Sequence, residues 1–232
     1  MQETSLFRKF LAKIRGMTTL KDKIIEAGFA DHILTDVDLN NLLEGTPASR
    51  YGMVNKALKK EELIKIRRGL YLLADKYRHK KLSKFFLASR IVPHSYISLE
   101  SALSYHGWIP ERVSTVTSVL ALGRSKKFTT LFGEFAFYHF PVNEYEFLTG
   151  VIRSEEIKGE PFLLASPLRA LADLVYVRKI DWEGLNLLTS GLRIDIEQLR
   201  QINPNHFFTI KKVYRSTRVL KFLDNLKMEL KK

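Results

Sequence analysis

The sequence contains no cysteine among its 232 residues. This absence excludes disulfide bonds, cysteine-ligated zinc, iron–sulfur clusters and thiol catalysis together. No apolar run approaches the ~18 residues that a membrane span needs, and Met1–Arg15 lacks the continuous apolar core of a signal peptide. We therefore expect a cytoplasmic protein with no membrane partner.

Catalytic and cofactor-binding motifs are also missing. The six histidines never stand at metal-ligand spacing with a carboxylate, and neither a glycine-rich phosphate loop nor a Gly-x-Ser-x-Gly elbow occurs. Three carboxylates in apolar or strand-rich segments, Glu100, Glu134 and Asp173, are the remaining candidates for a metal site. The sequence predicts a protein that is not an enzyme and that has neither cofactor nor metal.

Positive charge, in contrast, is abundant and unevenly distributed. The formal net charge is +13, and two short stretches carry nearly all of it. Residues 47–80 hold 10 basic and 3 acidic side chains, and residues 203–232 hold 8 and 2. Such concentration is typical of a surface that binds a polyanion, although a solubilising surface with a basic tail has the same composition.

Apolar periodicity divides the chain into three parts of an α+β protein. Residues 1–17 predict an amphipathic helix that packs on the body or on a second copy. Residues 18–78 form a first domain, and a basic, polar stretch separates them from a second domain over 79–232. Each domain is expected to have its own pattern of helices and strands.

The order of elements in residues 18–78 is that of a winged helix-turn-helix. Helices are expected over 21–27, from Thr35 to Gly45, and over 48–60. Two strands, 63–66 and 70–73, enclose a basic turn. In a winged helix the third helix enters the major groove of DNA and the turn contacts phosphates or the adjacent minor groove.

The third helix separates its side chains by chemical character. At about 100° per residue, Tyr51, Val54 and Leu58 fall in one arc that we expect to face the core. Tyr51 has a second interpretation, in which its hydroxyl donates to a phosphate. The other side of the helix carries short polar and basic side chains. Those expected to reach base edges are Ser49, Met53, Lys56 and Lys60, and those expected on phosphates are Arg50, Lys59, Arg67 and Arg68.

The second domain is expected to be mixed α/β. The segments 128–131 and 135–140 predict an antiparallel hairpin rich in aromatic residues, 162–165 a buried strand, and Ser166-Pro167 the start of a helix. The chain ends in a predicted amphipathic helix over 210–230. Its basic side is either a second DNA-contacting surface or the solvent-exposed side of a structural helix, and comprises Lys211, Lys212, Arg215, Arg218 and Lys221.

Four sequence runs resemble the AbiEi-type antitoxins, which are transcriptional regulators in bacterial two-gene toxin–antitoxin and phage-defence systems of type IV. The first is the basic turn and its strand, Arg67–Tyr71, and the other three lie in the second domain in the expected order. They are Tyr96–Leu103, Phe135–His139 and Ala165–Leu174. Residues 1–17 and the basic C-terminal segment lie outside this resemblance.

The resemblance implies a bacterial, cytoplasmic antitoxin that binds inverted repeats in its own promoter as double-stranded DNA and represses its operon. It also implies a nucleotidyltransferase-like toxin as functional partner, without requiring a stable complex. The protein would be a monomer in solution or a dimer on DNA. Two alternatives remain open: a metal-dependent DNA nuclease with a winged-helix targeting domain, and a winged helix that docks a protein.

Overall fold

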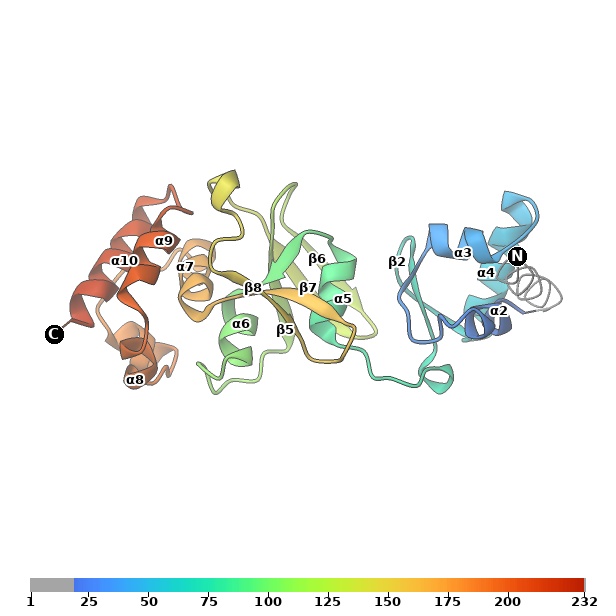
Figure 1. Ribbon diagram of the computed structural model, residues 1–232, viewed down its shortest axis with the longest axis horizontal. Coiled ribbons are helices and arrows are strands. Elements are labelled where there is room, and N and C mark those ends of the chain that lie inside the picture. The colour runs from blue at the N-terminus through green and yellow to red at the C-terminus, as the bar shows by residue number, and fades with distance from the viewer. Residues whose placement is uncertain (1–18, 232) are drawn as a thin grey trace, which may run out of the picture. The chain divides into compact units, whose positions relative to one another are not determined.

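The computed structural model describes residues 19–231, which divide into two units between Leu82 and Ser83. Each unit has its own sheet, so the chain is a mixed α+β protein with two sheets (Figure 1). The helix predicted over residues 1–17 lies outside the described residues. None of the helices between residues 19 and 231 combines the length and apolar character that crossing a bilayer requires.

From residue 19 onward, the N-terminal unit has three helices and a three-stranded antiparallel sheet, with strand order β1-β3-β2. Its core is an apolar cluster to which all three helices and the strands contribute, including Ile24, Leu39, Ala57 and Leu73. The elements are α2 (Leu20–Glu26), β1 (Leu34–Thr35), α3 (Asp36–Leu42), α4 (Pro47–Lys59), β2 (Leu63–Arg67), β3 (Leu70–Leu73) and the 3₁₀ turn η1 (Asp75–Tyr77).

Local side-chain chemistry explains where these helices begin. Thr35 and Asp38 form a reciprocal capping box at α3, in which Asp38 accepts from the Thr35 N–H at 2.7 Å and Thr35 accepts from the Asp38 N–H at 3.2 Å. At α4, Thr46 accepts from the Ser49 N–H at 3.3 Å and Pro47 is the first helical residue. The three predicted helices and the two strands of the hairpin are confirmed to within a few residues.

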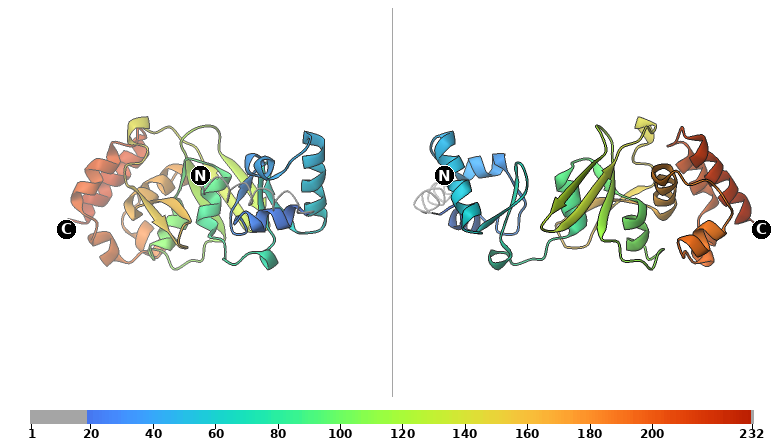
Figure 2. Two further views of the ribbon diagram at one scale, coloured as in Figure 1. Left: turned by 45° about the vertical axis from the view of Figure 1, so that its right-hand side comes forward. Right: turned by 180° about the vertical axis from the view of Figure 1, so that it is seen from behind.

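The C-terminal unit is built on a six-stranded mixed sheet with strand order β6-β7-β5-β4-β9-β8, seen from two further sides in Figure 2. The strands are β4 (Ser95–Ile97), β5 (Thr115–Leu120), β6 (Lys126–Thr130), β7 (Gly133–Tyr138), β8 (Val151–Glu155) and β9 (Pro161–Ala165). The helices are α5 (Lys84–Ile91), α6 (Leu99–Tyr105), α7 (Pro167–Arg178), α8 (Ile196–Arg200), α9 (Pro204–Lys211) and α10 (Thr217–Glu229), with the short turns η2 (Glu144–Glu146) and η3 (Leu187–Gly191).

Helices cover this sheet and extend beyond it. α5 packs against β4, β5 and β9, and α6 packs against β5 and α7. The C-terminal helices α9 and α10, drawn orange to red in Figure 1, pack on α7 rather than on the sheet. The predicted aromatic hairpin is confirmed as β6 and β7, which pair antiparallel with Phe128 opposite Phe135.

The single helix predicted over residues 210–230 is wrong, because the chain forms two helices there. α9 ends at Lys211 and α10 begins at Thr217. Between them the Val213 carbonyl accepts from the Asn143 N–H at 2.9 Å, and Tyr214 forms an isolated bridge with Val142. Contacts with a distant segment therefore interrupt a sequence whose apolar period would allow one continuous helix.

Candidate nucleic-acid interface

Helix α4 is anchored by a narrow line of side chains. Ala57 is buried in the core cluster, and Met53, Val54 and Leu58 are partly buried against it. The small Ala57 side chain lets the backbone of α4 approach the core closely. The helix therefore buries the face centred on Ala57, and the rest of its surface is open to solvent.

Two side chains on this helix lie differently from expectation. Met53, expected near base edges, packs against the core cluster. Tyr51, for which a place in the core was one of two interpretations, is 71% exposed. The buried face is centred on Ala57 and not on the arc through Tyr51, Val54 and Leu58. At about 100° per residue, Met53 lies about 40° from Ala57 and Tyr51 about 120° away. Packing therefore places Met53 against the core, and the Tyr51 hydroxyl remains in solvent.

The structure leaves most of the other predicted contact residues on the surface. Arg50 and Arg67 are half-buried, and the Arg67 guanidinium donates to the Arg68 carbonyl at 3.0 Å. The chain carries the remaining residues on the outside of α4, just after its end, or in the β2–β3 turn. The exposed members are Ser49, Lys56, Lys59, Lys60 and Arg68.

The β2–β3 turn lies close to the start of α3, and a glycine in the turn allows this close approach. Gly69 has φ +74, and a Cβ at this position would lie 2.9 Å from a carboxylate oxygen of Asp36. A side chain is disfavoured here both by the left-handed backbone conformation and by this close approach. Because it has no side chain, Gly69 allows the basic β2–β3 turn to lie next to α3.

A cleft of about 540 Å³ lies between the start of α4, helix α3 and the hairpin. Three cationic side chains line it, from three different elements: Arg50 of α4, Lys65 of β2 and Arg68 of the turn. Tyr51 also lines it, together with Asp36 and Tyr71. Cations outnumber carboxylates in this lining by three to one, which gives the cleft a positive potential.

The deeper wall of the cleft is polar and partly unsatisfied. Tyr71 is 9% exposed and is hydrogen-bonded to Asp36. Burial, followed by the negative charge of Asp36, raises the pKa of the Tyr71 hydroxyl, which therefore stays protonated at neutral pH. The Nε of Arg50 is buried and has no hydrogen-bond partner among the described residues.

Sequence reasoning did not select Lys65 as a contact residue. It lies in β2 between Ile64 and Ile66, and the period of two in a strand turns its side chain away from the buried Ile66. The alternation of inward and outward side chains along the strand was the sequence signal available for Lys65. It indicates that Lys65 is exposed, but it does not indicate that Arg50 and Arg68 lie beside it.

The predicted second basic surface is divided between two helices and partly neutralised. Lys211 pairs with Asp224 at 2.7 Å, and Arg218 pairs with Asp181 at 2.8 Å. The side chains of Lys212, Arg215 and Lys221 are exposed. Two of its five cations therefore have carboxylate partners, and the other three are unpaired by carboxylates among the described residues.

The three carboxylates considered for a metal site do not form a cluster. Glu100 pairs with Arg178 at 2.7 Å, and Glu134 accepts from the Thr115 hydroxyl at 3.0 Å. Asp173 is fully buried elsewhere. Within residues 19–231 no group of three or more histidine, aspartate or glutamate side chains is arranged to hold a metal ion.

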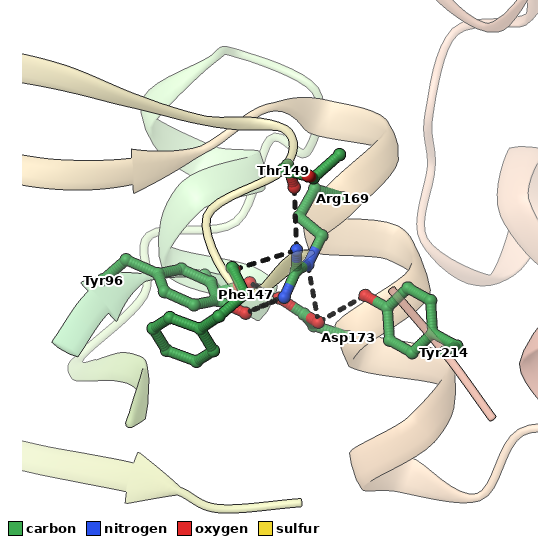
Figure 3. Close-up of polar contacts among 7 residues, drawn as sticks. Tyr96, Phe147, Thr149, Arg169, Asp173 and Tyr214 are labelled. Carbon is green, nitrogen blue, oxygen red and sulfur yellow. Dashed lines mark hydrogen bonds and ion pairs between the residues drawn. The ribbon is translucent and has the colours of Figure 1, made fainter. Parts of the chain in front are cut away.

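Asp173 belongs to a buried polar network centred on α7 (Figure 3). Its carboxylate accepts from Arg169 Nε at 3.1 Å, from the Tyr96 hydroxyl at 2.9 Å and from the Ser98 hydroxyl at 2.7 Å, and it also accepts from the Tyr214 hydroxyl. Ser98 is the residue before α6, but its hydroxyl makes no capping hydrogen bond to that helix and donates to Asp173. The network joins β4, α7 and the segment between α9 and α10.

The Arg169 side chain completes this network. It is fully buried and donates to the Thr149 carbonyl at 2.7 Å and to the Phe147 carbonyl at 3.2 Å. Burial has the largest single effect and lowers the pKa of the guanidinium. The charge of Asp173, the two neighbouring tyrosines and the hydrogen bond to Asp173 together outweigh it, so the pKa is raised. Every polar side chain of the network has a hydrogen-bond partner, and none is accessible to solvent. The network therefore has a structural role and is not a reactive centre.

The sequence matches no protein-family model and no curated protein. The resemblance to the AbiEi-type antitoxins therefore stays a prediction based on the four sequence runs. Two of these runs supply the buried network, because Tyr96 and Ser98 belong to one and Arg169 and Asp173 to another. These two runs therefore supply core residues of the C-terminal unit and not an exposed site.

Proposed function

We propose that the N-terminal unit is a winged helix-turn-helix that binds duplex DNA. The order α2-β1-α3-α4-β2-β3, the short connection between α3 and α4, and the sheet order β1-β3-β2 support this proposal. In such a unit α4 is the recognition helix and the β2–β3 turn is the wing. The exposed Ser49, Lys56 and Lys59 would then face the major groove.

The observation that carries the proposal is the cationic cleft beside α4. Arg50, Lys65 and Arg68 come from three elements and line one cavity. Basic side chains that only keep a protein soluble have no need to meet at one site. A DNA backbone crossing the cleft would place phosphates within reach of all three cations. Tyr51, exposed at the cleft, would donate its hydroxyl to the same backbone.

Fluorescence anisotropy with the duplex upstream of the protein's own gene tests this proposal. The triple variant Arg50→Ala/Lys65→Ala/Arg68→Ala should weaken binding to all sequences. It should also flatten the plot of log K against log salt by about 0.9 for each lost phosphate contact. Arg90→Ala/Arg112→Ala/Lys158→Ala removes the same charge from exposed sites in the C-terminal unit and serves as the matched control.

Equal losses in the triple variant and its control would refute the cleft as the binding site. A full-length protein that shifts no duplex at low salt would refute DNA binding and favour a protein-docking winged helix. Cleavage of the duplex in the presence of Mg²⁺, lost on Glu134→Ala, would favour the nuclease alternative.

We further propose that the protein is an antitoxin and autorepressor, as its resemblance to the AbiEi-type antitoxins implies. The test is co-expression with the product of the neighbouring gene, which this proposal predicts to be a nucleotidyltransferase-like toxin. The intact protein should restore growth, and the triple cleft variant should restore it equally, because the resemblance implies that the C-terminal unit opposes the toxin. Loss of rescue in the triple variant would show that antitoxin action needs the DNA-binding cleft. Growth arrest that the intact protein does not relieve would refute the antitoxin assignment.

A further inference from the structure

The two edges of the six-stranded sheet differ in how they are protected. The β6 edge carries two exposed lysines, Lys126 and Lys127, which disfavour pairing with another strand. The β8 edge, Val151–Glu155, has neither lysine nor proline, and its Ile152 is 52% exposed. No described strand pairs with the outer side of β8.

The hydrogen-bond phase of β8 determines which backbone groups this edge offers. The Ser166 N–H donates to the Gly150 carbonyl at 2.7 Å, next to the pair Val151 and Ala165. In an antiparallel ladder this makes Val151–Ala165 a non-hydrogen-bonded pair, so Arg153 and Glu155 are in the same phase. Their N–H and C=O groups point away from β9. The Val151 N–H also points outward and is already used by the Leu148 carbonyl at 3.0 Å.

We propose that β8 pairs antiparallel with β8 of a second copy of this chain, across a two-fold axis at Ser154. A two-fold axis perpendicular to the sheet keeps every residue on its own face, so only residues of the same parity can lie opposite one another. With Ser154 at the axis, Arg153 lies opposite Glu155 of the partner subunit and Glu155 opposite Arg153 of the partner subunit. Both pairs are hydrogen-bonded pairs, and together they use the outward N–H and C=O groups of Arg153 and Glu155 in each copy.

Charge selects this register over its neighbour. Moving the axis to Arg153 would place two arginines opposite each other, and moving it to Glu155 would place two glutamates opposite each other. Opposite charges directly across antiparallel strands stabilise pairing, and like charges oppose it. Arg153 is exposed and has no side-chain partner among the described residues, so it is available for this pair. The inference concerns the C-terminal unit and holds whether or not the protein binds DNA.

A cysteine at the axis tests the geometry, since the native chain has none. In a non-hydrogen-bonded pair the two Cα atoms lie about 4.5 Å apart, within the range of a disulfide. Mild oxidation of Ser154→Cys should therefore give a covalent dimer that reductant reverses. Lys127→Cys, exposed on the β6 edge, is the matched control and should stay monomeric. Equal crosslinking of the two variants, no crosslinking of Ser154→Cys, or preferential crosslinking of Arg153→Cys would overturn the proposal.

Charge reversal tests the same register without a covalent bond. Arg153→Glu should raise the dimer dissociation constant about tenfold in sedimentation experiments, because two cross-strand attractions become repulsions. The double variant Arg153→Glu/Glu155→Arg restores both pairs with exchanged signs, so it should dimerise like the native chain. A double variant as weak as Arg153→Glu, or a native chain that remains monomeric at high concentration, would overturn the proposal. Thermal melting by circular dichroism confirms that each variant folds.

Discussion

The buried pair Arg169–Asp173 allows a sharp prediction about the stability of the C-terminal unit. Asp173→Asn preserves shape but removes the charge that balances a fully buried guanidinium. The carboxylate accepts four hydrogen bonds, and the asparagine has only one acceptor oxygen for the same donors. Breaking a buried ion pair on one side typically costs about 3–5 kcal/mol, so we expect the free energy of unfolding to fall by about 4 kcal/mol.

Urea unfolding monitored by tryptophan fluorescence measures this effect in the right unit. Both tryptophans, Trp108 and Trp182, lie in the C-terminal unit, so the signal reports on that unit alone. Arg169→Met should be similarly destabilising, because it leaves a buried carboxylate uncompensated. The double variant Arg169→Met/Asp173→Leu removes both charges and should lose much less than the sum of the single variants.

Two results would refute this reasoning. A loss below about 1 kcal/mol for Asp173→Asn would mean that water or another cation compensates Arg169. Strict additivity in the double variant would mean that the two side chains do not act as a pair.

Three further predictions follow from particular residues. Burial raises the pKa of Tyr96 and Tyr214 well above the ordinary value, so both stay neutral in the folded chain while the unfolded chain ionises them above about pH 10. These two tyrosines should therefore not affect the stability of the C-terminal unit below that pH and should lower it above, by about 1.4 kcal/mol per pH unit for each. Tyr214→Phe should reduce the slope by one such contribution, and an unchanged slope would contradict this. Gly69→Ala should destabilise the N-terminal unit by about 1–2 kcal/mol in hydrogen-exchange measurements, because alanine disfavours φ +74, and an alanine variant as stable as the native unit would show that the turn relaxes. Tyr51→Ala should weaken duplex binding without changing the melting temperature, since the side chain is 71% exposed, and a drop in melting temperature would place Tyr51 in the packing instead.

Much of the N-terminal unit could be predicted because its signals are local. The Thr35–Asp38 capping box, the Thr46-Pro47 helix start and the Arg67-Arg68-Gly69 turn each act within four residues of one another. The aromatic hairpin β6–β7 is equally local. Such interactions depend on neighbours in the chain, so a pattern of residue types is enough to locate them.

The candidate site was only partly predictable, since its residues come from distant segments. Arg50 and Arg68 were identified from helix and turn positions, but Lys65 was not, and nothing local indicates that the three share one cleft. The arc through Tyr51 was expected to face the core, but α4 buries the face centred on Ala57, which turns Met53 inward and leaves Tyr51 exposed. The side that faces the core depends on what α4 packs against, and the helix alone does not specify that.

Composition and spacing thus account for the α+β class, for the absence of thiol chemistry, for the helix starts, and for the two stretches that carry the positive charge. Long-range packing decides the rest. It interrupts the C-terminal helix at Val213 and Tyr214, and it directs the Ser98 hydroxyl to Asp173. It also leaves β8 as an edge strand of the sheet. The physical reason is that buried polar groups must find partners wherever the fold brings them. These partners are fixed by contacts between residues tens of positions apart, such as Tyr96 and Asp173, which no local pattern encodes.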